Sequence, residues 1–306
     1  MSFNLVQSPV EMACRNLDYE ETWVSIGDCP LLKMWGRMRI TMKAMRFLAE
    51  WVLLSSMMPG LIWARQEAGQ NPADASHGGQ SKPCHAKTSE KAFLKNLWCD
   101  QKAIWTAPVH SGSHLGLVIP LAAATAGLIA TDKYAGREIS ESPPGTSYRA
   151  GTDISLLGSA EGVVGITGTM YGIARLTHNE QMRSTALLSF EALADAGIAQ
   201  EILKAITQRE RPTEANGRML IDDGRGRFWA GGHSFPSGHA LGAWALASVI
   251  ASRYHDKAAV KYGAYGLAAL VSVSRLPARQ HFPSDVLVGS VFGYLIGHYV
   301  ARAHHL

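Results

Sequence analysis

The pattern of apolar and polar positions changes character near residue 90. Beyond it, long stretches rich in Ala, Gly, Leu and Val alternate with short loops that contain Gly, Pro, Asn or Asp. Apolar stretches of this length predict helices, and no pattern typical of a β-hairpin stands out. The helices are expected at roughly 92–105, 114–132, 152–176, 181–211, 237–254, 257–276 and 283–303.

These elements predict an all-α fold, a helical bundle of about six core helices in one domain over 91–306. The chain has 306 residues, of which 47% are hydrophobic and 18% charged, so it can bury a large core. The active site is expected where helix ends converge. The net charge of +4 does not point to nucleic acid, but it suits anionic phosphate substrates or an anionic membrane surface.

The first 90 residues are expected to lie outside this domain. Residues 1–36 are polar and mixed in charge, and they form an N-terminal extension. Within 37–64, four basic residues precede the apolar run WVLLSSMMPGLIWA, which is typical of a signal peptide but short for a membrane span. The alternative is a buried or anchoring helix. Residues 65–90 are rich in Gln, Ala, Gly and Ser and are interpreted as a flexible linker.

The signal-peptide interpretation predicts export to the periplasm or cell envelope. Translation would then start at Met38, Met42 or Met45, so the extension would not be translated, and cleavage would fall near Ala64 or Ala68.

Export leaves two cysteines in the mature chain, Cys84 and Cys99. An oxidising compartment permits a Cys84–Cys99 disulfide, but two unpaired structural cysteines are an equal alternative.

Three short blocks between Lys204 and Asp285 concentrate groups that bind anions and transfer protons. They read KAITQRERP, PSGH and SRLPARQHFPSD. Lys204 and Arg211 are seven residues apart, so a helix would present both cations on one face before Pro212 ends it.

The PSGH block predicts a helix N-terminus. Pro236 or Ser237 can open a helix, which leaves the amides of Ser237, Gly238 and His239 without intrahelical partners. Free amides at the positive end of a helix attract anions, and Gly238 lets an oxyanion approach the backbone.

The third block places a histidine beside a carboxylate. Arg275 ends one predicted helix, and Pro283 suits the first turn of the next. His281 therefore lies just before that turn and Asp285 lies within it. Asp285 can reach one imidazole nitrogen and hold the other toward a substrate, which activates a histidine as nucleophile or base. The three blocks together suggest phosphate chemistry.

The pattern K-x6-RP, PSGH and SR-x5-H-x3-D resembles the three-part signature of the type 2 phosphatidic acid phosphatase and vanadium haloperoxidase superfamily. All specified positions are present in order. The resemblance implies that Lys204, Arg211 and Arg275 bind the phosphoryl oxygens, and that Ser237 and the amide of Gly238 donate hydrogen bonds to the same group.

The resemblance also implies a phosphohistidine mechanism. His281 would attack phosphorus, and Asp285 would orient it. His239, with a pKa expected near the usual value of about 6.5, would protonate the leaving alkoxide and then deprotonate water. Phosphoryl transfer needs mainly positioning and charge stabilisation, so the scheme requires no metal.

The sequence therefore predicts a metal-independent phosphatase, without a cofactor, for a lipid or small organic phosphomonoester or diphosphate. A vanadium-dependent haloperoxidase would fill the same pocket with vanadate, and a binding module would hold phosphate without chemistry. The intact set of His239, His281 and Asp285 argues against the module, because anion binding needs no oriented nucleophile.

An exported helical bundle that faces the periplasm, with or without contact to the membrane surface, is favoured over the alternative of an integral protein with six spans. Only 115–131 and 286–300 are apolar enough to be candidate spans, while other helices carry Glu161, Glu191 or Asp195. Glu191 and Asp195 are interpreted as structural.

Two remaining interpretations concern the loops and the C-terminus. His304 and His305 are expected in a frayed C-terminus. The long connection 212–235 is expected to line the site. Phe228 and Trp229 are expected to pin it to the bundle, and the alternative is that they form a wall of the pocket.

Overall fold

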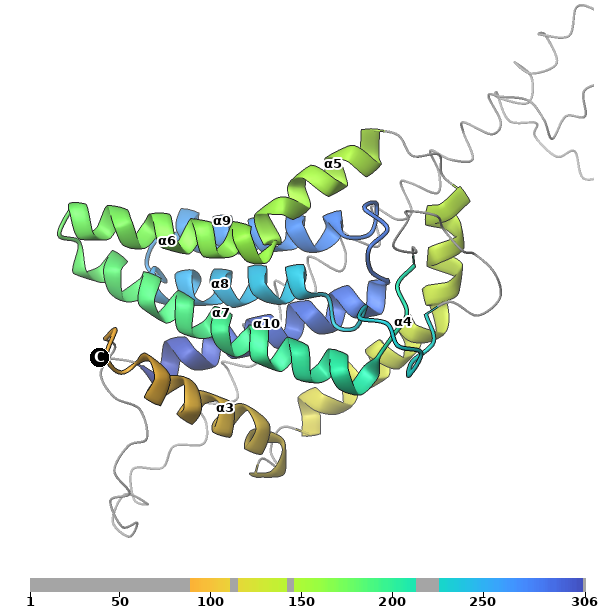
Figure 1. The fold of residues 1–306 in the computed structure, drawn as a ribbon, viewed down its shortest axis with the longest axis horizontal. Helices are drawn as coiled ribbons and strands as arrows, with labels where there is room; N and C mark the ends of the chain where they lie inside the picture. Colours follow the sequence, from red (N-terminus) through yellow and green to blue (C-terminus); the bar gives the residue numbers. More distant parts are fainter. Residues whose placement is uncertain (1–88, 111–114, 142–145, 213–225, 305–306) are drawn as a thin grey trace, which may run out of the picture. The chain divides into compact units, whose positions relative to one another are not determined.

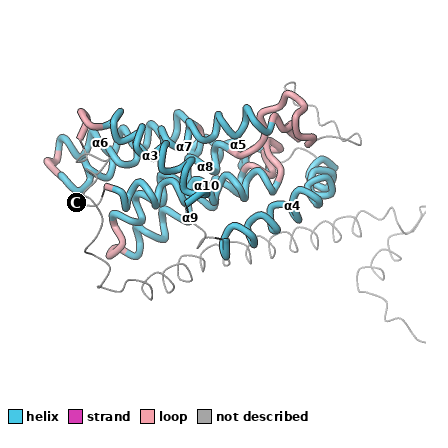
Figure 2. Tube along the Cα trace, turned by 90° about the horizontal axis from the view of Figure 1, so that it is seen from below, coloured by secondary structure: helices cyan, strands magenta, loops and turns pink. Residues whose placement is uncertain are grey.

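The described residues form helices joined by loops, without a strand among them (Figure 2). In this computed structural model the described ranges are 89–110, 115–141, 146–212 and 226–304. The expected all-α fold is confirmed. The predicted extension, the signal peptide or anchor, and all but the last two residues of the linker lie outside the described residues.

Figure 1 shows the order of the helices. They are α3 (Phe93–His110), α4 (Leu115–Glu141), α5 (Thr146–Ser155), α6 (Ala160–Leu176), α7 (Glu180–Thr207), α8 (Gly238–Arg253), α9 (Ala258–Ser274) and α10 (Pro283–Ala303), with a 3-10 turn, η5 (Leu156–Gly158), between α5 and α6.

The single helix predicted over 152–176 is wrong, because Ser159 divides it. The backbone of Ser159 is extended, and its hydroxyl accepts a hydrogen bond from the amide of Gly162. Ser159 is thus the N-cap of α6, a role that serine fills well.

The helix predicted over 181–211 also ends early, at Thr207. Gln208 adopts a left-handed conformation with φ 44°, which ends a helix in the manner usual for a C-terminal cap. Pro212 further disfavours a helical conformation at Arg211. Lys204 therefore lies in the last turn of α7, and Arg211 lies in the loop beyond it.

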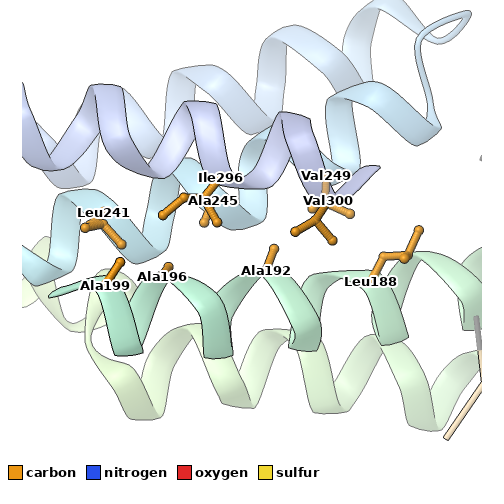
Figure 3. Close-up of a cluster of buried hydrophobic side chains, with 9 residues drawn as sticks. All are labelled: Leu188, Ala192, Ala196, Ala199, Leu241, Ala245, Val249, Ile296 and Val300. Atoms are coloured by element: carbon orange, nitrogen blue, oxygen red, sulfur yellow. The ribbon is translucent and has the colours of Figure 1, made fainter. Parts of the chain in front are cut away.

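The core is built around α8, which packs against α7 and α10. Figure 3 shows one apolar cluster that all three helices share. Its members are small or branched, which lets the helices pack closely: Leu188, Ala192, Ala196, Ala199, Leu241, Ala245, Val249, Ile296 and Val300.

Helices α8 and α10 touch backbone to backbone. A Cβ atom on Gly293 would overlap the carbonyl oxygen of Leu241, and one on Gly297 would overlap that of Ala245. The residue numbers of these contacts increase in the same direction along both helices, so α8 and α10 run parallel. Their N-termini consequently lie at the same end of the bundle.

We expect Gly293→Ala to destabilise the protein, because its methyl group would meet a backbone carbonyl that cannot move aside. Overpacking of this kind costs roughly 1–3 kcal/mol. The matched control is Gly168→Ala in α6, where a Cβ meets nothing within 4 Å and alanine favours the helix. Thermal unfolding checks both variants, and equal midpoints for them would contradict the close contact.

The end of α10 is tied to α3 by a buried polar cluster. His304 is only 5% exposed, so its expected fraying is wrong. Its Nε2 lies 3.4 Å from Asp100 Oδ2 and 3.8 Å from Glu191 Oε2, while Asn96 Nδ2 lies 3.5 Å from its Nδ1. Helices α3, α7 and α10 all contribute to this cluster.

Asp195 of α7 lies in the same region and is fully buried. Gln101 donates a hydrogen bond of 2.8 Å to its Oδ1, but Oδ2 has no hydrogen-bond partner among the described residues. Burial, and then the negative charges of Asp100 and Glu191, raise the pKa of Asp195 to about 8. The folded protein therefore holds a proton there that the unfolded chain releases above pH 4 or so.

We expect Asp195 to weaken the folded state as the pH rises toward 8. Its pKa is higher in the folded than in the unfolded state, so stability falls between the two values. Asp195→Asn should remove this part of the pH dependence and unfold at a higher temperature than the wild type at pH 8. The exposed Asp153→Asn serves as control. Parallel melting curves for wild type and Asp195→Asn from pH 5 to pH 8 would contradict the assignment.

Cys99 on α3 is buried and forms a disulfide whose partner lies outside the described residues. The alternative with an unpaired Cys99 is therefore wrong, while its pairing with Cys84 stays a prediction.

Among the described helices of at least 18 residues, α10 alone is apolar enough to cross a membrane by length and composition. Over half of its apolar window is buried inside the bundle, as in the core helix of many soluble proteins.

Candidate active site

The three sequence blocks meet at the end of the bundle where α7 and α9 finish and α8 and α10 begin (Figure 1). A cavity of about 380 Å³ lies there. Six of the eight predicted site residues line it: Lys204, Arg211, Gly238, His239, Arg275 and His281. The other two, Ser237 and Asp285, are fully buried behind it.

Lys204 and Arg211 reach the cavity from different segments, not from one helical face as expected. Lys204 Nζ lies 3.3 Å from the exposed carboxylate of Glu201. Arg211 donates a hydrogen bond of 3.0 Å to Gln280, the residue before His281. The early end of α7 explains the difference, because it frees Arg211 to turn over the cavity.

The N-terminus of α8 forms another wall of the cavity. Gly238 is its first residue, and Ser237 makes no side-chain capping bond. The first amides of α8 therefore remain available to an anion. A Cβ on Gly238 would overlap the side chain of Gln200 on α7, so glycine is needed here for packing as well.

Two buried polar atoms of this region have no hydrogen-bond partner among the described residues. They are Oγ of Ser237 and Nε of Arg275. Buried donors are normally paired, so each is suited to a ligand oxygen. Both belong to the predicted phosphate-binding set.

His281 has a defined tautomer. Its Nδ1 lies 2.8 Å from the backbone carbonyl of Ser234. A carbonyl oxygen can only accept, so Nδ1 must carry the hydrogen, and the neutral ring keeps its lone pair on Nε2. Burial, and then the positive charges of Arg275 and Arg211, lower the pKa of His281 despite the nearby Asp285. The imidazole is therefore in the neutral form that a nucleophile requires.

Asp285 faces the imidazole as expected, but its Oδ2 lies 3.7 Å from His281 Nδ1, which is longer than a direct hydrogen bond. That oxygen instead accepts bonds from Ser234 Oγ at 2.6 Å and the Phe282 amide at 2.9 Å. Ser234 thus links the two residues, because its hydroxyl donates to Asp285 and its carbonyl accepts from His281. Burial opposes ionisation of Asp285, but the contact with His281, the charge of Arg209 and the bond from Ser234 keep its pKa below the usual value.

Sequence reasoning missed Ser234, Arg209 and Asp132. Arg209 NH1 lies 2.6 Å from Asp285 Oδ1, and its NH2 lies 2.7 Å from Asp132 Oδ2 on α4. Arg209 and Ser234 occupy unspecified positions beside the motif residues. The only sequence signal for Asp132 is a carboxylate directly after an apolar run, where a buried partner is to be expected.

Of the two aromatic residues expected to pin the loop before α8 to the bundle, Phe228 packs its ring against other side chains as expected. The ring of Phe228 contacts Phe235 and lies 4.8 Å from the guanidinium of Arg209. The ring of Trp229 is 79% exposed, and its backbone amide, not its ring, bonds to α7 through the carbonyl of Thr207 at 2.8 Å. Residues 213–225 of this loop lie outside the described residues.

His239 lies in the first turn of α8, and its environment opposes a positive charge. Burial, and then the positive charges of Arg275, Arg211 and Lys204, lower its pKa to about 3. The expected value near 6.5 is therefore wrong for the protein alone. A bound dianion would offset these cations and raise the pKa again, so His239 can acquire a proton together with the substrate.

We expect the binding of a dianion to take up a proton at His239. Because the pKa is higher with the anion bound, affinity should fall as the pH rises. Calorimetry of sulfate binding near pH 5.5, in buffers with different heats of ionisation, measures the uptake. His239→Gln should bind sulfate with a smaller uptake, and an uptake equal to that of the wild type would contradict the assignment.

Comparisons with known proteins agree with the signature. Residues 185–306 match the model of the PAP2 superfamily. A curated relative is the lipid A 1-phosphatase of Porphyromonas gingivalis, 29% identical over 101 residues. The match covers 26% of this chain and 23% of the relative, so this chain aligns with about a quarter of that protein.

Two solved structures are also similar in part. LpxE of Aquifex aeolicus has 22% identity and a TM-score of 0.42, covering 55% of this chain and 92% of that one. A transmembrane PAP2-type phosphatidylglycerolphosphate phosphatase of Bacillus subtilis has 20% identity and a TM-score of 0.45, covering 67% and 92%.

The site is thus a cavity at converging helix ends, lined by Lys204, Arg211 and Arg275 and by a histidine whose Nδ1 is held by a backbone carbonyl. Residues 185–306, which carry most of its lining, match the model of the PAP2 superfamily.

Proposed function

We propose that this protein is a phosphatase that hydrolyses a phosphomonoester or diphosphate through a phosphohistidine intermediate, without a metal or cofactor. The convergence of cations around the His281 imidazole in one cavity carries the proposal. The unpaired donors of Ser237 and Arg275 support it, since a phosphoryl group would satisfy both. The match of residues 185–306 to the model of the PAP2 superfamily points the same way.

In the first step the Nε2 lone pair of His281 attacks phosphorus. A nitrogen–phosphorus bond forms while the bond to the ester oxygen breaks, and the electron pair leaves with that oxygen. Protonated His239 gives its proton to the leaving oxygen. The Nδ1–H of His281 remains hydrogen-bonded to the Ser234 carbonyl, which keeps the ring oriented throughout the reaction.

In the second step a water molecule attacks the phosphohistidine and His239 accepts its proton. The nitrogen–phosphorus bond breaks, and phosphate and the neutral His281 are released. Lys204, Arg211 and Arg275 stabilise the negative charge on the equatorial oxygens in both steps. The first amides of α8 act on the same charge from the helix terminus.

The substrate is proposed to carry an apolar chain. One side of the cavity is lined by apolar residues of α6, α7 and α8, among them Val163, Val164, Leu193 and Leu241. Val164 is half exposed, so this apolar wall continues from the cavity to the surface. A lipid phosphate fits this arrangement, with its chain along α6 and its phosphate at the cations. The curated relative's name, lipid A 1-phosphatase, also describes a lipid substrate.

A lipid substrate implies that the protein works at a membrane. Large apolar residues are exposed along α6 and α9: Val164, Ile166, Ile173, Leu176, Val260, Tyr262, Leu267 and Leu270. Surfaces of this kind suit contact with lipid. The disulfide at Cys99 supports the predicted export, because disulfides persist in oxidising compartments. We therefore place the protein in the cell envelope, associated with its membrane.

The test is phosphate release by full-length protein in detergent, with EDTA present, from lipid phosphates and from soluble monophosphates. We expect release from lipid phosphates, inhibition by orthovanadate, and an acid-labile phosphoprotein on rapid quenching. His281→Ala should lose turnover by at least about 10³-fold and form no phosphoprotein.

Normal turnover by His281→Ala would contradict the nucleophile assignment. Halide oxidation that depends on vanadate and peroxide, with no phosphate release, would instead indicate a haloperoxidase. Release from soluble esters alone would contradict the lipid substrate.

A further inference from the structure

Arg209 differs in its contacts from every other cation of the three blocks. It lies two residues before Arg211, yet it does not line the cavity, and it is only 2% exposed. Its NH1 is 2.6 Å from Asp285 Oδ1 and 2.6 Å from Ser284 Oγ, and its NH2 is 2.7 Å from Asp132 Oδ2. Two carboxylates therefore share this one guanidinium, and no surface of it is left for substrate.

Aromatic rings and a carbonyl complete the enclosure of Arg209. The centroids of Phe228 and Phe282 lie 4.8 Å and 4.5 Å from its Cζ. Its Nε donates to the carbonyl of Gly226 at 3.1 Å. Excluding water strengthens the ion pairs and fixes the plane of the guanidinium.

Asp132 belongs to α4, far from the three blocks in the sequence and outside residues 185–306. It also accepts hydrogen bonds from the hydroxyl and the amide of Ser284, in the first turn of α10. One carboxylate of α4 thus holds both Arg209 and the helix turn that carries Asp285.

We propose that Arg209 and Asp132 are positioning residues for the nucleophile His281. They act through Asp285 and Ser234, whose hydroxyl binds Asp285 and whose carbonyl receives the Nδ1–H of His281. This proposal rests on the proposed function of His281.

The geometry explains why a direct bond between Asp285 and His281 is not needed. Oδ1 of Asp285 is bound by Arg209, and Oδ2 by Ser234 and the Phe282 amide. With both oxygens bound, Asp285 is fixed and in turn fixes Ser234. Loss of Arg209 or Asp132 would remove the first contacts in this series of hydrogen bonds. Asp285 and Ser234 would then be held less firmly, and the imidazole would lose its alignment with phosphorus.

A planar guanidinium is required at position 209. It presents separate N–H groups to Asp132 and Asp285 at once, whereas the ammonium of lysine is a point charge on a flexible stem. Arg209→Lys should therefore keep the charge but not the alignment. A misplacement of about 1 Å can cost about 10²-fold in rate.

The experiment compares steady-state kinetics and anion affinity in full-length variants. For Asp132→Asn we expect kcat to fall about 10- to 100-fold, with KM and the Kd of orthovanadate within about twofold of the wild type. Arg209→Lys should lower kcat at least as much. Asp132→Glu, which keeps the charge, should retain more of kcat than Asp132→Asn and covers the case in which Asp132→Asn fails to fold.

The matched control is Glu210→Gln. Glu210 is adjacent to Arg209 in the sequence, but its partner is Arg227, which is 69% exposed. This variant changes a charge on the same loop without touching Asp285, and its kcat should match that of the wild type.

Wild-type kcat in Asp132→Asn or Arg209→Lys would overturn the positioning proposal. The proposal would also be overturned if these variants lost vanadate affinity and thermal stability together with kcat, because that result indicates a general structural role. In both cases the wild type still releases phosphate. Absence of release by the wild type from every substrate would contradict the proposed function and, with it, the role of His281 on which this proposal rests.

Discussion

The close parallel contact of α8 and α10 is the constraint on which the site depends. Glycines of α10, such as Gly293 and Gly297, let the two backbones touch. This contact fixes how far one helix is shifted along the other and brings both N-termini to the same end of the bundle. The amide of Ser237 bonds to the carbonyl of Asp285 at 3.0 Å, so the two helix starts are joined directly. Because both helices begin at this end of the bundle, the positive ends of both dipoles lie there, which favours the proposed phosphate site before any side chain is considered.

Cationic side chains add to this positive potential, and the histidines respond to it. Burial together with the charges of Arg275, Arg211 and Lys204 holds His239 neutral, with a pKa of about 3. A neutral His281 can attack phosphorus, but a neutral His239 cannot protonate a leaving group. Under the proposed function, one electrostatic environment thus favours the nucleophile and opposes the acid until a dianion offsets the cations. Substrate binding and the protonation of His239 would then be coupled through charge.

The sequence was sufficient for the fold class and for most of the residues that meet at the cavity, because spacing within each block limits where those residues can lie. It was insufficient for contacts between distant segments. Asp132 and Arg209 are 77 residues apart, and no local pattern pairs them. The direct Asp285–His281 bond was expected from a spacing that permits it, but Ser234 competes for the same oxygen. His304 was assigned to a frayed end because its partners on α3 and α7 are likewise remote.

The contacts of each cation separate substrate binding from positioning. Among the described residues Lys204 pairs with Glu201, which is 69% exposed, and Arg211 bonds to a neutral amide. Under the proposed function a phosphoryl oxygen would replace both partners. Arg275 keeps a buried donor without a partner among the described residues. Arg209 alone among them is held by two buried carboxylates. Since breaking a buried ion pair costs several kcal/mol, Arg209 stays in place while the others can turn to the substrate.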